Sequence, residues 1–146
     1  MAYEAIINGA RGLIFFGGHI AVAWSPEDAR LGWAWRFWNR VLRPVIEEIG
    51  DQSPLYPALL AGNSRLPIQV TGAPGIEFCA REVGGDLFLL ACKREGETVE
   101  VEFSGLPPTA GAAEVLFEEP RVVTAHGGRF TDWFAPFDVH VYRFRR

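Results

Sequence analysis

Short apolar runs separated by turn residues fill residues 66–146, and they constrain the fold of this chain more than any other feature. The stretch Val-Glu-Val-Glu-Phe-Ser at 99–104 alternates apolar with polar residues, as a strand with one buried face does. Residues 87–92 form a continuous apolar run, which predicts a central strand. Glycines and prolines punctuate these runs at intervals typical of an antiparallel sandwich. We expect strands at 68–71, 75–83, 86–94, 97–104, 112–118, 120–125, 128–133 and 137–145.

Residues 1–62 have a different texture, because their apolar residues recur at helical spacing. Residues 2–10 predict a short helix. The glycine-bounded apolar run at 12–18 predicts a strand buried on both faces. Such a strand needs parallel neighbours, which this chain does not obviously supply.

A long helix is predicted next. Ser25 can cap it, and Pro26 fits its first helical position. We expect the helix to run to Ile49, with a kink at Pro44 because proline cannot donate the helical hydrogen bond. Its apolar residues form two bands, so cover is expected on both sides. One band comprises Leu31, Trp35, Trp38, Leu42, Val45 and Ile49, and the other comprises Trp33, Phe37 and Val41.

These textures predict an α+β chain of two domains. Residues 1–62 would form a helix–strand–helix segment packed on a C-terminal antiparallel Greek-key β-sandwich of residues 66–146. The aromatic-rich helix needs a larger partner surface than the sandwich offers, since an exposed aromatic band is an association site. We therefore expect an interface, either with a missing part of a larger fold or with a second copy of the chain. Its residues would be Trp33, Trp35, Phe37 and Trp38.

Composition excludes several classes of function. The net charge of −4, with no Lys/Arg cluster before the last four residues, argues against nucleic acid as a partner. No apolar run reaches the roughly 20 residues that span a bilayer, so no membrane segment is expected. Glu4, Asn8 and Arg11 interrupt the first apolar stretch, and no signal peptide is expected. The sequence does not predict where in or outside the cell the protein is located.

Two cysteines, Cys79 and Cys92, flank a predicted hairpin turn at Gly-Gly-Asp, residues 84–86. If the second glycine and the aspartate form the centre of the turn, the two cysteines lie opposite each other. If the two glycines do, Cys79 faces Leu90 instead. The sequence leaves this register open and favours two reduced, buried thiols. Neither the spacing nor a nearby histidine indicates a zinc site, so we expect no metal and no cofactor.

Three short motifs carry a resemblance to a known family. They are Asn-Gly-Ala-Arg-Gly at 8–12, Phe-Ala-Pro at 134–136 and Val-His-Val-Tyr at 139–142. In this order they resemble the C-terminal end of (β/α)8-barrel glycoside hydrolases, which comprises the last barrel strand and helix and the small β-sandwich that follows. A whole barrel needs typically ~250 residues, so 146 residues cannot contain one.

The resemblance also implies where the chemistry lies. The catalytic carboxylates of that family come from the fourth and seventh barrel strands, and neither motif is found in this chain, so we expect no catalytic residue. Only His19 and Trp24 would approach the substrate mouth, where an imidazole and an aromatic ring could bind a sugar. The competing interpretation is a loop histidine beside a packed tryptophan.

Three hypotheses for function follow. The first is a non-catalytic, stabilising portion of a glycoside hydrolase-like protein, without hydrolase activity in isolation. The second is a carbohydrate-binding module, for which Trp133 and Tyr142 are the only aromatic candidates outside the helix, although both are expected to pack inward. The third is a homo-oligomerising domain that associates through the Trp-rich helix.

Overall fold

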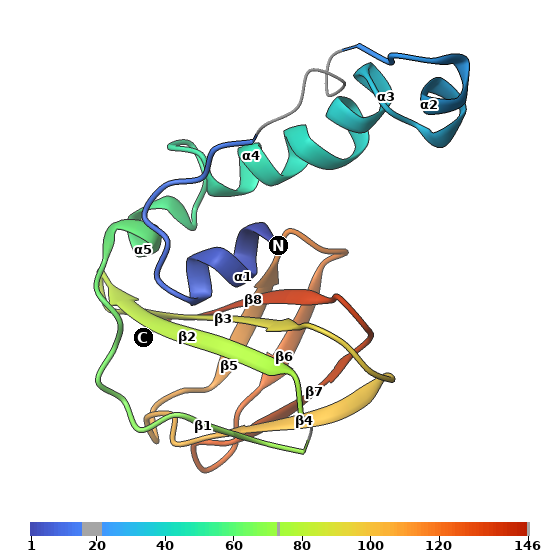
Figure 1. The fold of residues 1–146 in the computed structure, drawn as a ribbon. Coiled ribbons are helices and arrows are strands. Elements are labelled where there is room, and N and C mark those ends of the chain that lie inside the picture. Colours follow the sequence, from blue (N-terminus) through green and yellow to red (C-terminus); the bar gives the residue numbers. More distant parts are fainter. Residues whose placement is uncertain (16–21, 73, 146) are drawn as a thin grey trace. The chain divides into compact units, whose positions relative to one another are not determined.

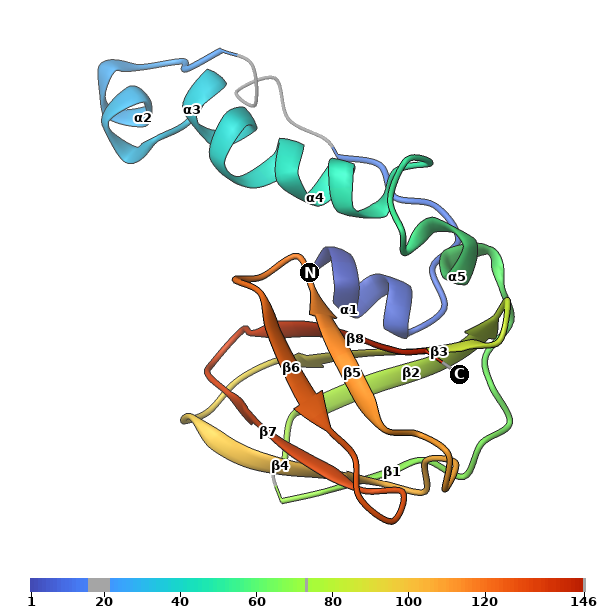
Figure 2. The same ribbon diagram turned by 180° about the vertical axis from the view of Figure 1, so that it is seen from behind.

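A computed structural model describes residues 1–15, 22–72 and 74–145 (Figures 1 and 2). The chain divides into two compact units, Arg11–Tyr56 on the one hand and Met1–Ala10 with Pro57–Arg146 on the other. These limits differ from the predicted domain limits, 1–62 and 66–146. The prediction that residues 1–62 are the remnant of a barrel is not tested by this division. The predicted α+β class is confirmed: helices occur together with two antiparallel sheets.

The predicted strands are present. The three-stranded sheet has the order β1-β4-β7, and the five-stranded sheet has the order β2-β3-β8-β5-β6. The strand limits are β1 Gln69–Thr71, β2 Ile76–Val83, β3 Asp86–Lys93, β4 Val99–Ser104, β5 Ala112–Leu116, β6 Arg121–Thr124, β7 Phe130–Phe134 and β8 Val139–Phe144. Only β2–β3 and β5–β6 are joined within one sheet. The other connections cross between the sheets, as expected for a sandwich of Greek-key type.

The core lies between the two sheets (Figure 1). Val101 and Phe103 of β4 are completely buried, which confirms the alternation read from residues 99–104. Phe103 stacks on Phe130 of β7 at 4.9 Å between ring centroids, and Phe130 meets Tyr142 of β8 edge to face at the same distance. Aromatic rings from both sheets therefore interlock, which favours one packing arrangement over others.

The five-stranded sheet is also covered on its outer side, where helix α1 (Ala2–Ile7) lies against β2 and β3 (Figures 1 and 2). Tyr3, Ile6 and Ile7 of α1 are buried. Successive residues of a strand face opposite sides of the sheet, so β3 needs apolar residues on both faces. This explains the continuous apolar run at 87–92 and confirms that β3 is a central strand.

The β2–β3 register resolves the two alternatives for the cysteines. Gly84 and Gly85 occupy the turn with φ of 61° and 90°, which glycine adopts without a steric penalty. Cys79 therefore pairs with Leu90. Cys92 pairs with Glu77 instead, and both thiols are buried and unbonded.

The unit Arg11–Tyr56 is helical, but the predicted continuous helix is wrong in its first half. Ser25 Oγ accepts from the backbone N–H of Asp28 at 3.1 Å and caps α2 (Pro26–Leu31). Gly32 then adopts a left-handed φ of 94°, and its N–H bonds to the Ala29 carbonyl, which ends the helix. The apolar residues keep their helical spacing beyond Gly32 because a new helix begins three residues later, at Trp35.

That second helical stretch runs through α3 (Trp35–Phe37), a π-helical turn η2 (Trp38–Leu42) and α4 (Arg43–Ile49). The N–H of Arg43 bonds to the carbonyl of Trp38, five residues earlier. Pro44 explains this geometry, because its ring would clash with a carbonyl four residues back in a regular helix and the wider turn makes room. The kink predicted at Pro44 therefore takes the form of a π-helical turn that ends two residues before the proline.

The predicted barrel strand at 12–18 is not confirmed. Residues 12–15 have no regular structure, and the remainder lies outside the described residues. Between α4 and the first strand lies a short helix that was not predicted, α5 (Tyr56–Leu60). Among the described residues, no helix is long and apolar enough to cross a membrane.

Candidate functional site

The residues predicted to meet a sugar are not brought together by what the structure describes. His19 lies outside the described residues. Trp24 precedes α2, and its side chain is 72% exposed. The sugar-binding role of this pair stays a prediction.

The four predicted interface residues form two aromatic pairs; Trp33 lies in the break between α2 and α3, and the other three lie in the helical stretch that follows. Trp33 and Phe37 have ring centroids 5.0 Å apart, and Trp35 meets Trp38 edge to face at 6.5 Å. Trp35 is the most outward of the four, with 63% of its surface exposed. Their role as an interface stays a prediction.

Sequence analysis missed a polar cluster that joins the two sheets. We call it the sheet-bridging cluster; its members are Glu118, Arg121, Asp132, His140 and Tyr142. Arg121, at the start of β6, donates through Nη1 to Asp132 Oδ2 on β7 at 2.7 Å. It also donates through Nε to Glu118 Oε2 at 2.9 Å. Because β6 and β7 belong to different sheets, the Arg121–Asp132 bond crosses the edge of the sandwich.

The last strand completes the cluster. Tyr142 Oη donates to Asp132 Oδ2 at 2.8 Å, and burial, followed by the Asp132 carboxylate, raises the pKa of Tyr142. The ring of His140 contacts Glu118 Oε1 through Nδ1, while its Nε2 lies 3.1 Å from the Trp133 carbonyl oxygen. The spacing of these residues in sequence, across three strands and a turn, gave no signal of the cluster.

Both carboxylates of the cluster are fully engaged by protein groups. The two oxygens of Glu118 contact His140 and Arg121. Those of Asp132 accept from the Trp133 backbone N–H, at 2.9 Å, and from Arg121 and Tyr142. Each oxygen has a partner within the fold, so the arrangement is that of a structural brace.

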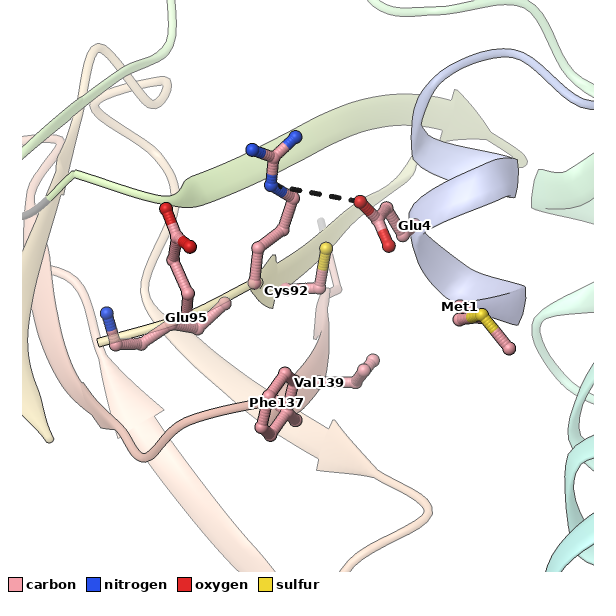
Figure 3. A pocket seen from close by; sticks show the side chains of 8 residues that line it. Met1, Glu4, Cys92, Glu95, Phe137 and Val139 are labelled. Atoms are coloured by element: carbon pink, nitrogen blue, oxygen red, sulfur yellow. Dashed lines mark ion pairs between the residues drawn. The ribbon is translucent and has the colours of Figure 1, made fainter. Parts of the chain in front are cut away.

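A pocket of about 290 Å³ lies between α1, the end of β3 and the β7–β8 turn (Figure 3). Figure 3 shows Glu4, Cys92 and Phe137 on different sides of it. The lining residues are Met1, Glu4, Cys92, Lys93, Arg94, Glu95, Phe137 and Val139. The pocket combines aliphatic and aromatic surface with two acidic and two basic side chains.

Ion pairs order one side of this pocket. Arg94 Nη1 lies 3.0 Å from Glu77 Oε1, and Arg94 Nε lies 3.9 Å from Glu4 Oε1, the contact drawn in Figure 3. Glu77 is also hydrogen-bonded by the side chain of Asn8. Helix α1 is thereby tied to the sheet at the pocket wall.

Cys92 is not a nucleophile in this setting. Burial, followed by the negative charges of Glu77 and Glu4, raises the pKa of its thiol to about 11. Near pH 7 the thiol therefore stays protonated, and the thiolate is the reactive form. Within the described part of the chain, no three His, Cys, Asp or Glu residues are grouped in a way that could hold a metal ion.

Arg81 is a second residue that sequence analysis missed. It lies on β2 with 2% of its surface exposed. Its guanidinium donates to the carbonyls of Ala58 at 3.2 Å and Leu59 at 2.7 Å, near the end of α5, and to that of Ile6 at 3.3 Å in α1. A positive charge is favourable at helix C-termini, where the carbonyl oxygens of the last turn carry the negative end of the helix dipole. The only sequence signal was a charge inside an otherwise apolar strand.

Comparisons with known proteins do not assign this chain to a family. No known protein family and no curated protein matches the chain. Among solved structures, it is similar to Gan42B, a GH42 beta-galactosidase from G. stearothermophilus, at 16% identity and a TM-score of 0.38. A catalytic mutant of the same enzyme gives 16% identity and 0.37. The match covers 78% of this chain but 13% of the enzyme. At these TM-scores the likeness assigns no residue and no activity to this chain.

Proposed function

We propose that this chain is a non-catalytic accessory portion of a glycoside hydrolase-like protein, in which the β-sandwich stabilises a barrel supplied by other residues. The ordered motifs at 8–12, 134–136 and 139–142 support the relationship, and the antiparallel sandwich agrees with it. The observation that carries the non-catalytic part is the sheet-bridging cluster. There, two carboxylates share one arginine, and all four of their oxygens have partners in the protein.

Glycoside hydrolysis makes different demands on two acids. A retaining enzyme needs a nucleophilic carboxylate and a proton-donating carboxylic acid about 5–5.5 Å apart, both reaching the same sugar bond. Glu118 and Asp132 are instead held by Arg121, His140 and Tyr142. Releasing Asp132 for chemistry would break its hydrogen bonds to Arg121 and Tyr142, which bridge the two sheets.

The coding region upstream of this chain provides the first test. An in-frame (β/α)8 sequence is expected there. In the joined protein, deletion of residues 66–146 is expected to lower the thermal unfolding temperature of the barrel while leaving its acids in place. Absence of any in-frame barrel, or a barrel that is equally stable without the sandwich, would refute the accessory role.

A carbohydrate-binding module is the second candidate, and one observation favours it. Tyr142 is completely buried, as expected, but Trp133 is 59% exposed, so its predicted inward packing is wrong. Trp133 pairs with Glu100 across β4 and β7, which offers a sugar an aromatic ring beside a carboxylate. Calorimetric titration with oligosaccharides tests this candidate. Heat that disappears in Trp133→Ala would favour it over the accessory role.

Self-association is the third candidate, favoured by the exposure of Trp35. A second copy would cover the aromatic pairs of the Trp-rich helix, and Trp35→Glu would then lower the association constant. Light scattering over a concentration series tests this. A monomer at every concentration eliminates it.

A further inference from the structure

One ring nitrogen of His140 lies between a hydrogen-bond donor and an acceptor. His140 belongs to β8 and to the sheet-bridging cluster, and its side chain is only 10% exposed. Its Nδ1 contacts Glu118 Oε1 and lies 3.2 Å from Arg121 Nη2. An ionised carboxylate can only accept a hydrogen bond, and a guanidinium can only donate one. Nδ1 can therefore satisfy one of these two partners at a time, and its own proton decides which.

The other ring nitrogen keeps the same partner in both cases. Nε2 lies 3.1 Å from the carbonyl oxygen of Trp133, which can only accept, so Nε2 carries a proton. Phe134 packs edge to face against the imidazole, with 4.4 Å between the ring centroids, and holds the ring in place. The cationic and the neutral imidazole therefore fit the same ring position. The two forms differ in the partner of Nδ1.

The elements packed around His140 bring charged or titratable groups toward it. These are Lys93 of β3, Glu118 of the β5–β6 turn, Arg121 of β6, Asp132 of β7, Asp138 of the β7–β8 turn and Tyr142 of β8 itself. Asp138 Oδ2 lies 3.9 Å from Nε2. Lys93 follows Ala91, the partner of His140 in β3, by two residues, so it lies on the same face of the sheet, and its Nζ lies beside Gly96. A change of protonation at His140 thus exchanges a hydrogen bond at Nδ1, where Glu118 and Arg121 meet the ring.

We propose that His140 is a proton-dependent switch that sets how the β5–β6 turn is held to the last strand. With a proton on Nδ1, the ring donates to Glu118 Oε1 and bonds the turn directly to β8. Without that proton, Nδ1 accepts from Arg121 Nη2, and Glu118 keeps its bond from Arg121 Nε at 2.9 Å. Histidine is suited to such a switch because its charge ordinarily changes between about pH 5 and 8. The switch goes beyond the accessory role, since it requires no barrel.

NMR of the whole ¹⁵N-labelled chain between about pH 5 and 9 tests this proposal. Correlations between the ring protons and ring nitrogens of His140 show which nitrogen carries a proton. We expect protons on both nitrogens at the acidic end and on Nε2 alone at the basic end. The amide of Phe117, in the β5–β6 turn, should shift with the same midpoint as the His140 ring. His126 is exposed in the β6–β7 turn and is an internal control, whose titration should not move that amide.

Two substitutions separate the Nδ1 bond from a general effect of charge. Glu118→Ala removes the acceptor, so the pH-dependent shift of the Phe117 amide should disappear while the His140 ring still titrates. Glu119→Ala is the matched control: it removes the neighbouring exposed carboxylate and should leave the shift of the Phe117 amide intact. Amide spectra of both variants show directly whether they are folded.

Two results would overturn the proposal. One is a His140 ring with the same protonation across the whole range, which would make it a fixed part of the sheet-bridging cluster. The other is a Phe117 amide that moves with a different midpoint, or that still moves with His140 in Glu118→Ala, because the Nδ1 bond would then not be the cause. The titration of the original chain needs no variant, so the proposal can fail even if a substitution prevents folding.

Discussion

At the scale of single residues, a buried positive charge can be matched by backbone carbonyls in place of a carboxylate. Arg81 is the clearest case, because three carbonyls from α1 and α5 share its guanidinium. No carboxylate is required for this match, since the carbonyls at helix C-termini carry partial negative charge. A single side chain therefore fastens two helices to β2.

Replacing Arg81 by methionine is expected to lower the free energy of unfolding by about 2–4 kcal/mol, because the charge-assisted hydrogen bonds of the guanidinium to the Ile6, Ala58 and Leu59 carbonyls are lost. Arg65→Met is the matched control; Arg65 is exposed, and a change within about 0.5 kcal/mol is expected. Urea denaturation measures both. Equal effects of the two substitutions would show that Arg81 does not hold the helices.

The thiol of Cys92 predicts how stability changes with pH. Burial raises its pKa in the folded state from the usual value of 9.0 to about 11. As the pH rises above 9, the thiol ionises in the unfolded chain first, so the free energy of unfolding falls until about pH 11. Cys92→Ala should show a shallower decline than the original chain. Urea denaturation between pH 8 and pH 11 tests this, and parallel curves would contradict it.

At the scale of elements, turns and corners determine where each strand begins and ends. Gly105 follows β4 with a φ of 79°, and a Cβ there would lie 2.2 Å from the carbonyl oxygen of Pro67. Position 105 therefore excludes every side chain for two reasons, backbone conformation and lack of space. Gly84 has a similar φ of 61° but open space around it.

This contrast gives a paired prediction. Gly84→Ala is expected to cost about 1–2 kcal/mol, since only its left-handed conformation is penalised. Gly105→Ala should cost clearly more than this, because backbone atoms must also move. Thermal unfolding of both variants provides the comparison. A Gly105 variant as stable as the Gly84 variant would show that the close approach to Pro67 is absent.

The sheet-bridging cluster predicts energetic coupling between strands. Asp132→Ala and Tyr142→Phe each remove one end of a buried hydrogen bond, so their double-mutant cycle should give about 1 kcal/mol of coupling. A control cycle on Glu114 and Arg145, an exposed pair at 3.1 Å, should give at most about 0.5 kcal/mol. If the two substitutions lowered the free energy of unfolding additively, the hydrogen bond between Asp132 and Tyr142 would not couple the two strands.

Strands were predictable here because glycines and prolines mark their ends and alternation marks their faces. The prediction of one continuous helix was wrong at Gly32, which adopts a left-handed conformation and ends α2. Apolar residues keep their helical spacing on both sides of Gly32, so the periodicity gave no sign of the break. Arg81 could have been flagged as a charge in an apolar strand, but the carbonyls that it contacts lie far away in sequence. The sheet-bridging cluster depends on the packing of β6, β7 and β8, which no local pattern encodes.

At the scale of the whole molecule, the last strand organises the sandwich. β8 lies between β3 and β5, so the two hairpins of the five-stranded sheet are connected only through residues 139–144. β8 also contributes Tyr142 and Phe144 to the core and His140 to the cluster. Two residues of its Val-His-Val-Tyr motif, His140 and Tyr142, therefore have structural roles in the cluster and the core.

The central proposal is that Glu118 and Asp132 hold a scaffold together and that the chain cleaves no sugar. Hydrolysis of p-nitrophenyl glycosides by the purified chain tests this claim most directly. The account predicts a rate indistinguishable from buffer for every sugar. Turnover that co-elutes with the chain on a sizing column, and that disappears in Glu118→Gln or Asp132→Asn, would contradict it.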